Sequence, residues 1–207
     1  MRRNRATFLF AIGASFLWAN LSFKNLSVKN GLSENYCNVV SSDGSGFVWV
    51  GTDEGLNKYD GYLPAIYRSN PFDSTALSGN RVYNIFKDAG GEMWIATDKS
   101  LDKYVYGNNQ FRRHITNSRP TFIAEDNNET IWVGTIEDGL FEIDKNTGKI
   151  RNHRFSPLDP LSISSNSFSP NQKTPIVFDK DNNVWVGTNN GLNFYNRKTK
   201  TFRRFFP

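Results

Sequence analysis

The 207-residue sequence predicts an all-β fold built from four similar blocks. In each block an Asp lies six residues before a Trp, and a Leu follows the Trp after seven or eight residues. The Trp residues are 45, 38 and 53 residues apart, about the length of one supersecondary unit. No stretch after residue 20 shows a sustained helical period. The four sets are Asp43, Trp49 and Leu56; Asp88, Trp94 and Leu101; Asp126, Trp132 and Leu140; and Asp179, Trp185 and Leu192.

Each block is predicted to contain four short antiparallel strands. In the first block, residues 37–41 lead into a Gly-containing turn, and residues 47–52 are β-branched and aromatic, as in a half-buried strand. Two further strands follow at residues 56–59 and 63–67, each after a turn signal. Four-stranded blocks at this spacing are typical of a β-propeller. We therefore expect four blades, at about residues 36–68, 81–115, 120–155 and 168–206.

The repeated residues have structural explanations. An Asp that opens a hairpin can accept hydrogen bonds from backbone amides two residues on, which fixes the turn. A Gly follows the next turn in three blocks and predicts a positive φ angle rather than a phosphate-binding loop. In the second block Ser100 replaces that Gly and Ala96 replaces the Gly of the Trp strand, so we expect this blade to be the least regular. The three turn glycines are Gly55, Gly139 and Gly191.

A second repeated element, Leu/Ile-Ser-x-Asn, connects the blocks at residues 32–35, 77–80 and 163–166. The third block lacks it, and its first strand follows Pro120 almost directly. Long connections precede the last two copies, and the loops 70–80 and 156–166 are candidates for ligand binding by their length. We favour spacer loops over binding loops, so ligand-binding residues are unknown at this stage.

The N-terminus predicts export. Arg2, Arg3 and Arg5 precede an uncharged apolar run over residues 6–19, which is typical of a secretory signal peptide at residues 1–19 and short for a membrane span. An uncleaved anchor is the alternative, and it would be the only membrane contact. These 19 residues contain three Arg and no acidic residue, so 22 basic face 20 acidic residues in the remainder and nucleic acid is not an expected partner. The single Cys37 is expected to be a buried strand residue.

No catalytic, cofactor-binding or metal-binding residue is predicted. Both histidines, His114 and His153, fall in predicted strands without a Cys or an acid at ligand spacing. The turn at residues 179–183 resembles a calcium loop, but the Glu that completes such a loop is missing. Glu125 and the acids at 137–138 have no turn role, yet nothing marks them as the carboxylate pair of a glycosidase.

The block pattern resembles the two-component regulator propeller repeat. Its clearest copy comprises residues 31–35, Asp43, residues 49–52 and residues 55–61, and the resemblance extends over about residues 21–207. The family is the N-terminal periplasmic sensor region of hybrid two-component system histidine kinases of the Bacteroidetes type. The resemblance implies a periplasmic location, an oligosaccharide ligand released by glycan breakdown, and signalling to a cytoplasmic kinase.

The chain departs from that family in extent, because a family propeller has seven blades and only four are predicted here. We therefore expect an N-terminal fragment that forms an open, incomplete ring with exposed blade edges. Residues 21–28 are expected to be an orphan outer strand without its own blade. The missing blades or a second copy of the chain are the expected partners. The alternatives are a freestanding exported protein-interaction propeller and, less favoured, an exported glycan-active enzyme.

Overall fold

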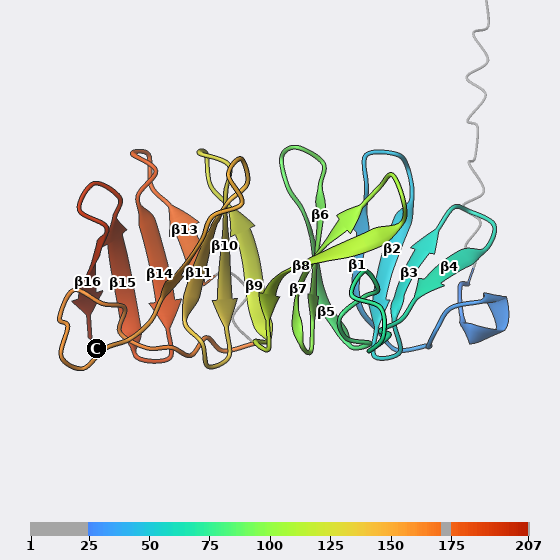
Figure 1. Ribbon diagram of the computed structural model, residues 1–207, viewed down its shortest axis with the longest axis horizontal. Helices are drawn as coiled ribbons and strands as arrows, with labels where there is room; N and C mark the ends of the chain where they lie inside the picture. Colours follow the sequence, from blue (N-terminus) through green and yellow to red (C-terminus); the bar gives the residue numbers. More distant parts are fainter. Residues whose placement is uncertain (1–24, 171–174, 207) are drawn as a thin grey trace, which may run out of the picture.

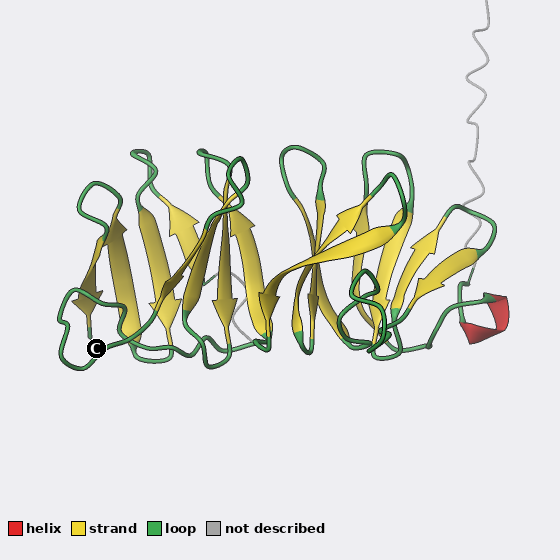
Figure 2. Cartoon of the chain, viewed as in Figure 1, coloured by secondary structure: helices red, strands yellow, loops and turns green. Residues whose placement is uncertain are grey.

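The computed structural model describes residues 25–170 and 175–206, which form four antiparallel sheets of four strands each (Figure 1, Figure 2). We number these blades 1 to 4 in chain order. Blade 1 holds β1 (Cys37–Ser42), β2 (Val48–Thr52), β3 (Leu56–Tyr59) and β4 (Pro64–Tyr67); blade 2 holds β5 (Val82–Lys87), β6 (Met93–Thr97), β7 (Ser100–Val105) and β8 (Gln110–Thr116); blade 3 holds β9 (Pro120–Glu125), β10 (Thr130–Thr135), β11 (Leu140–Asp144) and β12 (Ile150–His153); blade 4 holds β13 (Ile176–Phe178), β14 (Val184–Thr188), β15 (Gly191–Asn196) and β16 (Thr201–Phe205).

The all-β propeller and its open ring are confirmed. Within each blade the strands follow chain order, and Figure 1 shows the four sheets stacked in a row with blades 1 and 4 at opposite ends. No described helix is long and apolar enough to cross a membrane. The predicted signal peptide at residues 1–19 lies outside the described residues.

Successive side chains of each Trp-bearing strand point to opposite faces of its sheet. We call the face towards the following blade the back face and the face towards the preceding blade the front face. Trp94 points to the back face of blade 2, towards blade 3, whereas its neighbours Met93 and Ile95 point to the front face, towards blade 1. The same alternation gives three cores, one at each junction between successive blades. Trp49, Trp94 and Trp132 are fully buried in these cores. A Trp strand therefore contributes to two junctions at once.

Each Leu/Ile-Ser-x-Asn element fastens the connection to the blade that follows it. The Ser33 hydroxyl lies 2.8 Å from the Thr52 hydroxyl, and the Ser33 amide donates to the Asn57 side chain at 2.8 Å. Blades 2 and 4 repeat this network through Ser78 and Ser164. Blade 3 has no such element, and the residue that follows its repeat Leu is Phe141 rather than Asn or Asp. The polar partner is thus present only where the connecting Ser is present.

The structure corrects two predictions. Of the orphan outer strand expected at 21–28, residues 25–27 form no strand and Val28 begins the 3-10 helix η1 (Val28–Asn30); residues 21–24 lie outside the described part. The backbone turns there because Gly31 adopts φ 100°, a left-handed conformation that ends η1. Cys37 begins β1 as expected, but it is exposed because its neighbourhood is the uncovered front face of blade 1.

Candidate functional site

The repeated Asp binds the repeated Trp directly. The Asp126 carboxylate accepts hydrogen bonds from the amides of Asn128 and Thr130 at 2.7 and 3.1 Å, and from the indole of Trp132 at 2.7 Å. The same indole bond is 2.9 Å at Trp49, 3.0 Å at Trp94 and 3.3 Å at Trp185. The six-residue spacing therefore places a carboxylate over the turn and against the indole. Turn fixation was predicted, but the indole bond was not.

These hydrogen bonds act on the acidity of the Asp. Burial raises the pKa of Asp43, but the bonds from the Trp49 indole and from the Ser45 and Phe47 amides lower it more. The pKa of Asp43 therefore lies below its ordinary value, and that of Asp88 is lowered in the same way. Both groups are held as carboxylates at neutral pH. Because an anion accepts hydrogen bonds more strongly than a neutral acid, the charge stabilises the turn.

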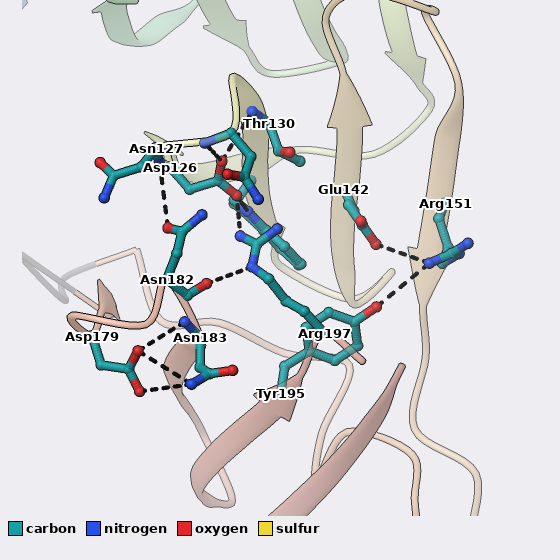
Figure 3. Close-up of polar contacts among 12 residues, drawn as sticks. Asp126, Asn127, Thr130, Glu142, Arg151, Asp179, Asn182, Asn183, Tyr195 and Arg197 are labelled. Atoms are coloured by element: carbon teal, nitrogen blue, oxygen red, sulfur yellow. Dashed lines mark hydrogen bonds and ion pairs between the residues drawn. The ribbon is translucent and has the colours of Figure 1, made fainter. Parts of the chain in front are cut away.

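A cation from the next blade binds the Asp at two junctions, and Figure 3 shows the second of them, between Arg197 and Asp126. Lys145, in the turn after β11, lies 3.1 Å from the Asp88 carboxylate and also pairs with Glu125. At the following junction the Arg197 guanidinium pairs with Asp126. Lys145 and Arg197 each lie five residues after the repeat Leu of their own blade. This spacing is a signal that sequence reasoning missed.

The back face of blade 3 carries a second polar cluster, shown in part in Figure 3. Glu142 on β11 lies 2.9 Å from Nε2 of His153 and 3.3 Å from Arg151, both on β12. The His153 ring stacks on Trp132, with 5.9 Å between ring centroids. Burial raises the pKa of Glu142, but the hydrogen bond with His153 and the charges of His153, Arg151 and Arg197 lower it below its ordinary value. The chain thus encloses a carboxylate between two nitrogen donors.

On the back face of blade 2, the strand positions that correspond to this polar cluster of blade 3 carry side chains with a different net charge. A pocket of about 200 Å³ lies there, lined by Trp94, Lys103, Arg112, His114 and the β11–β12 turn of blade 3. Nε2 of His114 is buried and has no hydrogen-bond partner among the described residues. Burial and the charges of Lys103 and Arg112 lower the pKa of His114 to about 4. The pocket therefore holds a neutral imidazole beside two cations.

The back face of blade 1 is different again. Lys58 lies over the rings of Phe47 and Trp49, at 4.1 and 5.4 Å from their centroids. The ring of Tyr104 from blade 2 is 5.2 Å from the same ammonium group. This position is already filled by aromatic rings, which attract a cation through their π faces.

The two long loops act as connections. The backbone oxygen of Thr75 accepts a hydrogen bond from Phe111 on β8 at 2.8 Å, and Leu161 does the same for Phe202 on β16. Each loop therefore packs against the outer strand of the blade it leads to. Their tips expose Phe72 and Leu158 almost completely. No binding residue can be assigned within the loops 70–80 and 156–166 on these contacts.

The acids left unexplained by the sequence do not come together. Glu125 ends β9 and pairs with Lys145, whereas Asp138 lies at the other end of the same sheet and pairs with Arg154 at 2.8 Å. Glu137 lies beside Asp138 in a separate cavity of about 330 Å³. Asp179 directs its carboxylate at the amides of Asp181 and Asn183, as a turn does. Within residues 25–170 and 175–206, no group of acids, His and Cys is placed to hold a metal ion.

Residues 76–99 and 167–190 match the family model described as two component regulator propeller. The fold is similar to the extracellular domain of a one-component system from Bacteroides thetaiotaomicron, with a TM-score of 0.68 and 26% identity over 89% of this chain and 27% of that one. It is also similar to the extracellular domain of a hybrid two-component system from B. thetaiotaomicron, with a TM-score of 0.61 and 26% identity over 87% and 31% of the two chains.

A 60-residue stretch is 45% identical to histidine kinase P4 of Formosa agariphila, covering 29% of this chain and 4% of the kinase. The chain spans about a third or less of each of these relatives. The two family matches fall in blades 2 and 4, and each contains the Asp–Trp pair described above. Two segments of the chain thus match the two-component regulator propeller repeat, and the fold resembles the extracellular domains of a one-component and of a hybrid two-component system.

Proposed function

We propose that these four blades form part of the extracellular ligand-sensing domain of a hybrid two-component system. The observation that carries this proposal is the likeness, at 26% identity and over most of this chain, to the extracellular domains of a one-component and of a hybrid two-component system. The basic and apolar N-terminal sequence supports export to the periplasm. In the complete sensor, the ligand is a product of glycan breakdown and the response passes to a histidine kinase.

The four blades alone are expected to bind glycan weakly or not at all. Face loops of a propeller converge only when the ring is closed, and here blades 1 and 4 lie at opposite ends of a row (Figure 1). The sensing role therefore belongs to the chain in its full-length context. A glycan-active enzyme is not favoured, because Glu125 and Asp138 lie at opposite ends of one sheet.

The test is a transplant into a working sensor. The four matching blades of the B. thetaiotaomicron extracellular domain would be replaced by residues 25–206, and calorimetry would compare both domains against one panel of oligosaccharides. We expect the hybrid domain to fold and to bind a glycan with altered specificity. A folded hybrid that binds no member of the panel, when the parent domain binds one, would contradict the proposal.

A second candidate function is favoured by the two open blade faces. The front face of blade 1 and the back face of blade 4 expose apolar side chains, among them Val40 and Leu192. At the internal junctions the apolar side chains at equivalent positions are buried. These faces fit further blades or a second copy of this chain. A propeller surface that recruits another protein outside the cell would use the same faces.

A further inference from the structure

The junctions after blades 2 and 3 share one sequence pattern on their outer strands. Blade 2 carries Arg112 and His114 on β8, and blade 3 carries Arg151 and His153 on β12, with one residue between Arg and His in both. Each His ring lies against the Trp of its own blade, at 4.8 Å for His114 and 5.9 Å for His153. The repeat therefore presents the same pair of nitrogen donors twice.

Blade 3 shows what this pair binds. Glu142 faces Trp132 across the sheet and is also paired in register with Arg151, so its carboxylate reaches both donors. It lies 2.9 Å from His153 and 3.3 Å from Arg151. A guanidinium and an imidazole N–H are suited to the two oxygens of a carboxylate.

Blade 2 has the donors without the carboxylate. Lys103 occupies the register position of Glu142, opposite both Trp94 and Arg112. A bulge between Leu101 and Asp102 displaces His114 along β8, yet His114 still lines the pocket together with Arg112. Nε2 of His114 has no partner, and Arg112 forms no ion pair with any residue in the described part of the chain.

The other charges at the pocket are already engaged. Lys103 lies 3.2 Å from Glu92, and Lys145 pairs with Asp88 and Glu125. Asp144 lines the pocket but accepts hydrogen bonds from the amides of its own turn at 2.9 Å. Arg112 is thus left as the uncompensated charge beside the unpaired His114.

We propose that the pocket between blades 2 and 3 binds a small carboxylate ligand, which occupies the place that Glu142 has in the next blade. The ligand carboxylate accepts hydrogen bonds from Arg112 and from Nε2 of His114. A volume of about 200 Å³ admits a carboxylate group and a few further atoms, as at one end of a sugar acid. The inference concerns only residues of this chain, so it does not rest on the proposed sensing function.

The test is a nuclear magnetic resonance titration of the full chain that follows the ring signals of both histidines. Glucuronate is expected to shift the His114 signal saturably in the millimolar range, while glucose leaves it unchanged. The His153 signal is an internal control, because Glu142 already fills its site. A response to glucuronate alone supports a carboxylate site, and an equal response to sulfate supports a general oxyanion site. Absence of a response to both anions overturns the proposal.

Three variants separate binding from stability. Arg112→Ala is expected to weaken glucuronate binding at least tenfold, whereas Arg203→Ala, at the same strand position on blade 4, leaves it unchanged. Lys103→Glu combined with Glu92→Gln places a carboxylate in the pocket as blade 3 does. This double variant is expected to abolish glucuronate binding and to raise the pKa of His114 from about 4. Unchanged binding in a folded double variant would show that the ligand lies elsewhere.

Discussion

The buried carboxylate of each repeat turn organises several donors at once. Asp126 accepts from two amides and an indole and also pairs with Arg197. Asp126→Ala leaves these buried donors unpaired, and each unpaired donor costs on the order of 1–3 kcal/mol. We expect the variant to lose about 3 kcal/mol of unfolding free energy, measured by urea denaturation with Trp fluorescence. Asp181→Ala, at an exposed position in the blade 4 turn, is the control and should change stability by less than about 0.5 kcal/mol. Equal losses of unfolding free energy in the two variants would contradict a special role of the Asp–Trp pair.

A second carboxylate has the opposite effect on stability. Burial raises the pKa of Asp102, outweighing the hydrogen bonds from Ser100 and Ser78. The folded state therefore binds a proton more tightly than the unfolded state, so Asp102 is most favourable at low pH and becomes destabilising as pH rises above about 4. Blades 1 and 4 carry Asn57 and Asn193 at this position, where the amide also donates to a strand carbonyl.

Asp102→Asn is accordingly expected to raise the free energy of unfolding at pH 7 by about 1 kcal/mol, the usual size of such a consensus change. The gain should shrink as pH falls towards 4, since the wild-type side chain then becomes neutral. Chemical denaturation at several pH values measures both effects. A gain that does not depend on pH would show that hydrogen bonding, rather than charge, causes it.

At the scale of a strand, the Gly two residues after the repeat Trp leaves room for a neighbouring side chain that packs over it. A Cβ atom on Gly134 would lie 2.0 Å from the Phe122 ring, whereas one on Gly187, in the open face of blade 4, would come no nearer than 3.8 Å to any atom. Gly134→Ala is expected to cost about 1–3 kcal/mol through overpacking. Gly187→Ala is the matched control and should be near neutral. Thermal unfolding of the two variants measures the difference. Equal losses of stability in both variants would indicate backbone strain rather than overpacking.

The elements that the sequence predicted correctly depend on local spacing. Each Trp strand follows a turn that is fixed by the Asp six residues before the Trp. The Asp and the Trp lie within one hairpin, so their spacing can be read from the sequence. The site residues depend instead on contacts between strands and blades. Arg197 contacts Asp126, which is 71 residues away in the sequence. The Arg112–His114 pair can be recognised as a candidate site only when the register of β8 with β7 is known. Cys37 was placed wrongly because burial depends on a neighbouring blade that the strand pattern alone does not show.

At the scale of the whole molecule, the blades form a stack with two unlike ends. Each internal junction packs the back face of one blade on the front face of the next. The terminal front face of blade 1 exposes Val40 and Ile66, and the terminal back face of blade 4 exposes Val177 and Leu192. A cavity of about 640 Å³ opens at that same end of blade 4. These faces complement each other in kind, so one copy can continue the stack of another.

We therefore predict head-to-tail self-association that increases with concentration, driven by the apolar area removed from water. It should be weaker than an internal junction, because blade 1 has Gly61 where blades 3 and 4 carry the cation that pairs with an Asp. Val40→Lys and Val177→Lys, each at one end, should shift the chain towards monomer without lowering its unfolding free energy. Phe72→Lys, an equally drastic change on an exposed loop tip, is the control and should leave association unchanged. Sedimentation velocity over a hundredfold concentration range measures the effect. A wild-type chain that stays monomeric throughout would show that these faces need further blades rather than a second copy.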